Sequence, residues 1–125
     1  MKVYTLYDPY EKNIEIYSAE GKKAKDIEIL AEAELGRARH IEALEAQRLE
    51  YHGKAVYWYN EAANALCTED GKYKITDLLN KRDASVANRK AIEATIESVK
   101  QMPDEDVLRR YGCGYCWTEY ELIEK

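Results

Sequence analysis

The chain has 125 residues, of which 46% are hydrophobic and 34% are charged, and its formal net charge is −5 at pH 7. This length and balance allow one hydrophobic core without a bias towards disorder, so we expect a single domain over residues 1–125. The negative net charge argues against binding to a nucleic-acid polymer, because that affinity depends on lysines and arginines that neutralise phosphates.

Aromatic residues are unusual in kind, with eleven Tyr, two Trp and no Phe. Such rings suit interfaces and pocket walls, since they bury like apolar groups and keep a polar tip. The first residues resemble no signal peptide, and no segment approaches the roughly 20 apolar residues of a membrane span. The three cysteines are an odd number, which fits reduced thiols better than a secreted disulfide framework. We expect a cytoplasmic protein with no membrane partner.

Two segments rich in β-forming residues open the chain, at 3–8 and 13–18. Turn-forming residues lie between them, at 8–12, so the pattern predicts a β-hairpin. The two isoleucines of the second segment would share one face, opposite Glu15 and Tyr17. One face is therefore expected to be packed and the other at least partly wet.

A long helical pattern follows Gly21, from about residue 23 to about residue 67. Only Gly36 and Gly53 interrupt it. Such a helix would extend roughly 66 Å, whereas a domain of this size has a radius of gyration of only about 14 Å. Either the helix bends near a glycine into a hairpin, or it extends and pairs with another subunit, which we favour. Its apolar stripe, with a period close to 3.6, is Ile27, Leu30/Ala31, Leu35, Ala38, Ile41, Leu49, Val56, Tyr59, Ala63 and Leu66.

A second apolar face of this helix is offset from the stripe. Its residues are Tyr51, Ala55, Trp58 and Ala62. A helix that is apolar on two faces is buried on two sides, which favours a helical partner. The competing interpretation is an aromatic platform for a nucleobase.

The long helix is expected to end near Gly71, which suits a left-handed position after a helix. Residues 76–77 could cap a second helix that Pro103 stops. A short turn followed by a fresh helix from Asp83 or Ser85 is an equal alternative.

A brief helix is expected to begin at residues 103–106, because proline and acidic residues favour a first turn, and to end at Gly112. The tail alternates over residues 115–123 and predicts a third strand, which pairs with the hairpin. The sequence therefore predicts an α+β fold, with a small three-stranded antiparallel sheet packed on long helices that form an oligomer interface.

Cys113 and Cys116 form a CxxC pair, which can be a redox pair or half of a zinc site. A redox motif of this kind needs a strand before it and a helix after it, and here the order is reversed. Zinc needs two further ligands, and Cys67, His40 and His52 lack the spacing of a second half-site. We expect a turn with packed thiols, no metal and no cofactor.

Two arginines, an aromatic ring and two glycines meet over residues 109–114, between the brief helix and the last strand. Arginine presents a planar fork that matches phosphate oxygens, and glycine permits close backbone approach to an anion. The expected ligand-binding residues are Arg109, Arg110, Tyr111, Asn88, Arg89 and Trp117. A surface turn with solvated arginines is the alternative at each position. No catalytic triad, phosphate-binding loop or carboxylate pair stands out, so we expect no enzyme and no catalytic residues.

Residues 86–90 and 107–117, together with the order of the predicted elements, resemble the Thoeris anti-defence sponge family of phage proteins. Members of this family sequester signals of the cyclic ADP-ribose type and, in some cases, cyclic oligonucleotides. The resemblance implies homo-oligomers, dimers or higher, with pockets at subunit interfaces and no bond breaking, acting in the host cytoplasm. It implies Arg109 and Arg110 on phosphate, Tyr111 or Trp117 stacked on a base, and Asn88 with Arg89 as hydrogen-bond donors. The rival hypothesis is a protein–protein inhibitor or adaptor whose long helix lies along a host protein.

Overall fold

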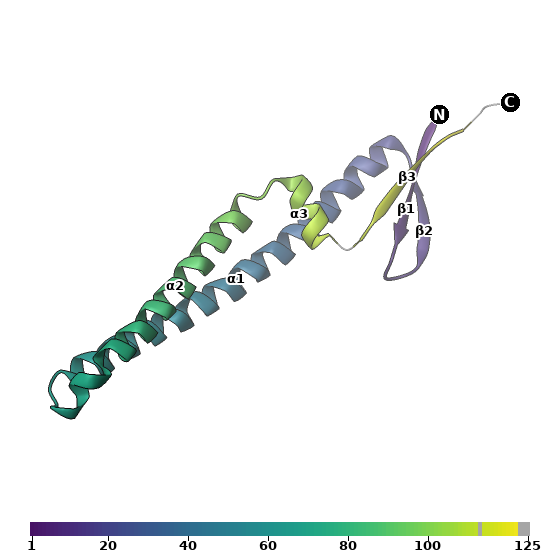
Figure 1. Ribbon diagram of the computed structural model, residues 1–125. Helices are drawn as coiled ribbons and strands as arrows, with labels where there is room; N and C mark the ends of the chain where they lie inside the picture. The colour runs from purple at the N-terminus through teal and green to yellow at the C-terminus, as the bar shows by residue number, and fades with distance from the viewer. Residues whose placement is uncertain (113, 123–125) are drawn as a thin grey trace. The chain divides into compact units, whose positions relative to one another are not determined.

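The structure is a computed structural model that describes residues 1–112 and 114–122 (Figure 1). The fold is α+β, as the sequence predicts. In chain order its elements are β1 (Lys2–Asp8), β2 (Asn13–Tyr17), α1 (Ala19–Ala65), the 3-10 turn η1 (Asp70–Lys74), α2 (Ile75–Lys100), α3 (Asp104–Tyr111) and β3 (Cys116–Glu121). The chain divides into two compact units. The first comprises residues 1–39 and 102–125, the second comprises residues 40–101, and α1 contributes to both.

The first unit holds an antiparallel sheet of three strands in the order β2-β1-β3. Tyr4 of β1 lies opposite Tyr17 of β2, and Leu6 of β1 lies opposite Trp117 of β3. The hairpin and its pairing with the C-terminal strand are thus confirmed. The central strand is β1, so the first and last strands of the described chain, β1 and β3, are neighbours, as Figure 1 shows.

The hairpin turn is built on Asp8. Its Oδ1 accepts hydrogen bonds from the backbone N–H groups of Tyr10, at 2.8 Å, and Glu11, at 3.3 Å. The Lys12 N–H donates to the Asp8 carbonyl at 2.8 Å, and Lys12 takes a positive φ of 56°. An aspartate that satisfies the next N–H groups is the expected chemistry for this turn.

The packed face of the sheet carries Tyr17, and the isoleucines of β2 lie on the exposed face. On the packed face, Leu6 is almost fully buried, and Trp117 makes edge-to-face contacts with Tyr4 and Tyr17. Alternation alone predicts two unlike faces and does not decide which one packs. Here the aromatic face packs, because its large rings reach α1.

Helix α1 begins earlier than its pattern predicts, at Ala19. Ser18 caps it, since the Ser18 Oγ accepts the N–H of Gly21 at 3.1 Å and the Ser18 carbonyl accepts that of Lys22 at 2.8 Å. The cap supplies acceptors for N–H groups that the first turn leaves free. The predicted break at Gly21 is therefore wrong, and Gly21 lies inside the first turn.

Helix α1 continues through Gly36 and Gly53 to Ala65, so a hairpin bend at either glycine is wrong. The chain turns after α1 instead, through η1. A Cβ at Gly71 would lie 2.5 Å from the Ala65 carbonyl oxygen, and Gly71 has no positive φ. Close backbone approach, rather than the expected left-handed conformation, therefore requires glycine here.

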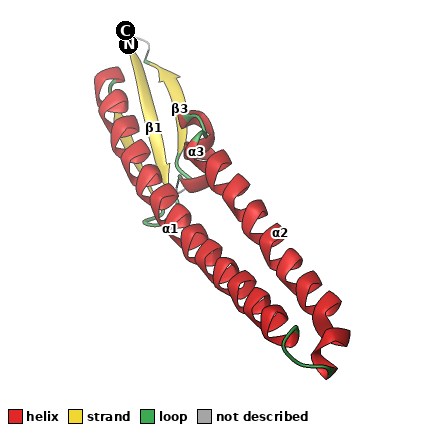
Figure 2. Ribbon diagram, turned by 90° about the vertical axis from the view of Figure 1, so that its left-hand side faces the viewer, coloured by secondary structure: helices red, strands yellow, loops and turns green. Residues whose placement is uncertain are grey.

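The second unit consists of the rest of α1, from His40, together with η1 and α2. Within it, α2 lies alongside α1 (Figure 2). The buried apolar residues of this unit are Leu44, Ala55 and Ala62 of α1 and Ile96 and Val99 of α2. Two of the four residues of the second apolar face predicted for α1, Ala55 and Ala62, are buried here within the chain.

Helix α2 is unbroken from Ile75 to Lys100, and no side chain caps its start. A cap at residues 76–77 and a fresh helix from Asp83 or Ser85 are both wrong, because η1 leads directly into α2 and supplies the preceding turn.

Helix α3 starts after Pro103 and ends at Gly112, as predicted. Acidic residues occupy its first turn and Arg109 and Arg110 its last, which suits the helix dipole. Within the described part of the chain, no helix combines the length and apolar character that a membrane crossing requires.

Candidate functional site

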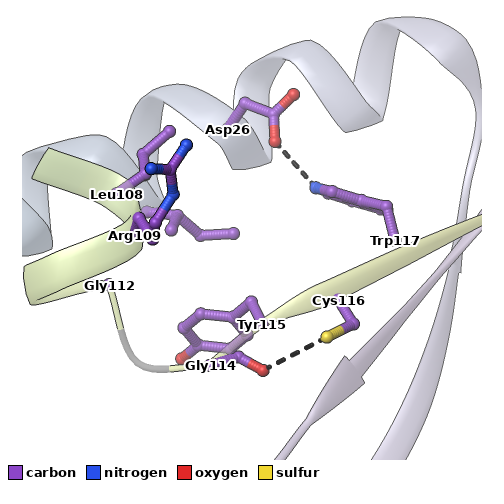
Figure 3. Close-up of a pocket in the computed structure, with 9 residues that line it drawn as sticks. Asp26, Leu108, Arg109, Gly112, Gly114, Tyr115, Cys116 and Trp117 are labelled. Atoms are coloured by element: carbon purple, nitrogen blue, oxygen red, sulfur yellow. Dashed lines mark hydrogen bonds between the residues drawn. The ribbon is translucent and has the colours of Figure 1, made fainter. Parts of the chain in front are cut away.

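The first unit contains a cavity of about 260 Å³. It lies where the end of α3 turns into β3, against the first half of α1 (Figure 3). Its lining residues are Asp26, Ile29, Leu108, Arg109, Gly112, Gly114, Tyr115, Cys116 and Trp117. Most of the residues that the sequence places at the α3–β3 junction thus face one hollow.

Two glycines shape this junction. The Gly112 N–H donates to the Leu108 carbonyl at 2.9 Å, and a Cβ at Gly112 would lie 2.1 Å from that carbonyl oxygen. Gly114 takes a φ of +75°, which residues with a side chain disfavour. The tight junction leads α3 into β3 so that Tyr115 and Trp117 reach the cavity wall.

The Trp117 ring is held on several sides. Its Nε1–H donates to Asp26 Oδ1 at 2.8 Å, as Figure 3 shows. The Tyr4 and Tyr17 rings meet it edge to face, with centroids 6.5 Å and 5.4 Å away. Its position is therefore fixed before any ligand arrives, which lowers the entropy cost of binding.

Asp26 is a wall residue that the sequence did not single out. The Lys22 Nζ lies 2.8 Å from Asp26 Oδ2 and 5.2 Å from the Trp117 ring centroid. The lysine therefore balances the carboxylate charge close to the ring. The four-residue spacing of Lys22 and Asp26 is a helix-pair signal, but nothing in the sequence connects it to a tryptophan near the other end of the chain.

Arg109 carries the positive charge of the cavity wall. Its side chain is 72% exposed, and its ion pairs with Glu105, at 3.6 Å, and Asp106, at 3.4 Å, are long. Exposed pairs of this kind contribute little stability. The guanidinium can therefore turn to an incoming anion at small cost.

Arg110 and Tyr111 follow Arg109 but do not line the cavity. The Arg110 guanidinium lies over the Tyr111 ring, 5.6 Å from its centroid. Tyr111 packs against α1 at Gly36, where an added Cβ would lie 3.4 Å from the Tyr111 Cβ. These two predicted site residues thus stand beside the cavity.

Asn88 and Arg89 belong to the second unit, on α2. The Arg89 Nη1 lies 3.1 Å from His52 Nδ1 on α1, and its Nε lies 3.5 Å from Glu93 Oε1. Asn88 is exposed. The structure therefore brings Arg109 and Trp117 together in one cavity and places Asn88 and Arg89 in the other unit.

The cavity lining combines one cation, one carboxylate that is paired with Lys22, two aromatic rings and two apolar side chains. These are Arg109, Asp26, Tyr115, Trp117, Ile29 and Leu108. Such a set suits a ligand with a flat ring and an anionic group. The Cys116 thiol lies 3.7 Å from the Gly114 carbonyl oxygen, and its CxxC partner Cys113 lies outside the described residues. Among the residues described, no group of three or more histidines, cysteines and acids is placed to hold a metal.

Tyr17, beside Trp117, donates a hydrogen bond to the Glu15 carboxylate. This bond raises the pKa of Tyr17 above its ordinary value of 10.0, because deprotonation would remove the donor and place two negative charges together. Glu15→Gln is expected to return the pKa of Tyr17 towards its ordinary value. Absorbance titration against a Tyr17→Phe reference measures it, and an unchanged titration would contradict the bond.

Comparisons of the chain with protein-family models, curated proteins and solved structures found no match.

Proposed function

We propose that the protein is a non-enzymatic binding protein that sequesters a nucleotide immune signal of the cyclic ADP-ribose type in the host cytoplasm, and thereby blocks an anti-phage defence. The observation that carries the proposal is the meeting of Arg109, from α3, and Trp117, from β3, in one cavity. A phosphate-binding group and a ring surface are the two parts that recognition of a nucleotide needs.

Each wall residue has a role in this proposal. The Arg109 guanidinium binds a phosphate through its planar fork. Tyr115 and Trp117 contact the base, because every base has a face that stacks on aromatic rings. Asp26 retains lone pairs beyond its two present hydrogen bonds, and these accept a ribose hydroxyl or an exocyclic amine.

The cavity is small for a whole ligand of the cyclic ADP-ribose type. Its volume of about 260 Å³ lies just below the roughly 300–1,000 Å³ of ordinary small-molecule sites. One chain is therefore proposed to hold one part of the ligand, such as the base and one phosphate, and a homo-oligomer to enclose the rest. In such a shared pocket, Asn88 and Arg89 would act from a second copy.

Isothermal titration calorimetry with cyclic ADP-ribose tests the site. Arg109→Ala is expected to weaken binding by about 1–3 kcal/mol, since a charge-assisted hydrogen bond is lost. Arg110→Ala is the matched control, because it removes the same charge from the neighbouring position outside the cavity lining. Equal affinities for the Arg109→Ala variant and the unmodified chain would remove Arg109 from the site.

The second candidate is a protein–protein inhibitor or adaptor that uses α1. The observation in its favour is the set of exposed large apolar residues along α1, including Ile27, Leu35 and Leu49. Such a protein would need no nucleotide. Failure of the purified chain to retain any nucleotide signal therefore favours this candidate.

A further inference from the structure

One face of α1 is exposed along its length and carries mostly small and apolar residues. Its positions recur at intervals of three or four residues: Ala24, Ile27, Ala31, Leu35, Ala38, Glu42, Ala46, Leu49, Gly53, Val56, Asn60 and Ala63. We call this set the α1 stripe. Ile27 is 71% exposed, Leu35 and Leu49 are each 60% exposed, and Val56 is 45% exposed. At 100° per residue all twelve positions fall within an arc of about 100°.

Packing within the chain uses another face of α1. In the first unit the buried positions are Ile29 and Ala33, and in the second they are Leu44, Ala55 and Ala62. The stripe therefore contributes nothing to either core. Four large apolar side chains exposed on one face of a helix are typical of a seam for a second helix.

Gly53 is the residue that intrachain packing explains least. A Cβ added there would meet nothing within 4 Å, and Gly53 has no positive φ. Glycine inside a helix costs about 1 kcal/mol relative to alanine. Close approach by a group from outside the chain would account for a glycine at this position.

We propose that a second copy of the chain covers the α1 stripe, with the two α1 helices antiparallel and a two-fold axis near residues 43–44. A residue i then faces a partner residue near 88 − i. Leu35 faces the partner's Gly53, Leu49 faces the partner's Ala38 and Val56 faces the partner's Ala31. Three of the four large side chains thus meet a small one, and Ile27 lies near the partner's Asn60. Such size complementarity is what a two-fold interface requires of a single surface.

Two pairs of opposite charge beside the stripe fit the same register, although Glu42 and the partner's Glu42 form a like pair near the two-fold axis. In an antiparallel two-fold pair, residues on one edge of the helix meet residues on the same edge of the partner. Arg39 then lies near the partner's Glu50, and Glu32 lies near the partner's Lys54; all four positions are exposed. A parallel pair would instead put Gly53 opposite Gly53, which leaves a gap, and Glu42 directly opposite Glu42, which is a closer repulsion.

The stripe is also large enough for an interface. From Ala24 to Ala63 it extends about 58 Å, and a helix with its side chains is about 10 Å wide. The contact would cover about 600 Å² of each copy, near the roughly 800 Å² per partner of a standard interface. No stripe position lines the described cavity, so pairing through the stripe and nucleotide binding by the cavity can be lost separately.

Disulfide cross-linking tests the register. In a chain with Cys67, Cys113 and Cys116 changed to serine, Leu35→Cys and Gly53→Cys are made separately. Mixed and oxidised, the two variants are expected to form a dimer with each other, while each alone stays uncross-linked. Self-cross-linking of each variant, as a parallel pair would give, or no cross-linking in the mixture, would overturn the proposal.

Sedimentation equilibrium tests the surface with substitutions that the monomer tolerates. Leu49→Asp is expected to raise the dimer Kd about a hundredfold or more, because the change occurs twice per dimer. Gln47→Asp, exposed on the same helix but off the stripe, is the matched control and should leave the Kd unchanged. Circular dichroism verifies that both variants fold. A monomeric unmodified chain, or equal Kd values for the two variants, would refute the interface.

Discussion

Trp117→Ala is expected to lower the free energy of unfolding by about 3–5 kcal/mol, the usual cost of deleting a large packed ring. The ring lies between Tyr4 and Tyr17 on the packed face of the sheet. Its Nε1–H also joins β3 to α1 through Asp26. Removing it leaves a void and takes a hydrogen-bond donor from the carboxylate. Urea unfolding followed by circular dichroism measures the loss.

Tyr120→Ala is the matched control, because it removes a ring from the same strand. Tyr120 is 53% exposed and belongs to the other face of the sheet, so its loss is expected to cost less than about 1 kcal/mol. Trp117→Phe keeps most of the ring but lacks the Nε1–H, and should fall between these variants. If Trp117→Ala costs no more than Tyr120→Ala, Trp117 does not join the sheet to α1.

Gly71→Ala is expected to lower the free energy of unfolding by about 2–3 kcal/mol through overpacking. The new Cβ would lie 2.5 Å from the Ala65 carbonyl oxygen and 2.8 Å from the Ala65 Cα. These are backbone atoms at the end of α1, so they cannot move aside as a flexible side chain would. The turn that leads into η1 and α2 must therefore shift. Thermal and urea unfolding measure the loss.

Gly53→Ala is the control with the opposite sign. Because a Cβ at Gly53 meets nothing within 4 Å, alanine there is expected to stabilise the chain by about 1 kcal/mol. The comparison is made at dilutions where the chain is monomeric. Similar destabilisation by both substitutions would show that general glycine replacement, rather than the contact with Ala65, sets the cost.

Local signals made most of the elements predictable. The hairpin follows from Asp8 and its turn, and α3 follows from Pro103, its acidic first turn and Gly112. The start of α1 does not follow from the apolar pattern, because Gly21 resembles a break, whereas Ser18 caps the helix and glycine is tolerated in its first turn. The packed face of the sheet was not predictable, since that choice depends on which rings reach α1.

The candidate site was predictable only where its residues are close in sequence. Arg109 and Trp117 belong to one short junction, so residue types alone pointed to both. Asp26 and Lys22 come from α1, and only the fold places them beside Trp117. Residue type and resemblance group Asn88 and Arg89 with the junction. Both residues instead lie in the second unit.

The two apolar faces of α1 were both visible in the sequence, but their roles were not. Periodicity identifies the first apolar face, which contains Leu35 and Leu49, and the offset second face, which contains Ala55 and Ala62. The chain buries those two alanines itself and leaves Leu35 and Leu49 of the first face exposed. Periodicity reports that a face is apolar, and only the tertiary fold shows which face still lacks a partner.

Capture of a nucleotide tests the central claim most directly. The purified chain is incubated with cyclic ADP-ribose, freed of unbound ligand by gel filtration and heated, and the supernatant is analysed by mass spectrometry. The account predicts release of intact cyclic ADP-ribose, with retention greatly reduced in the Arg109→Ala variant and unchanged in Arg110→Ala. Release of a converted product, or retention of no nucleotide by the unmodified chain, would contradict it.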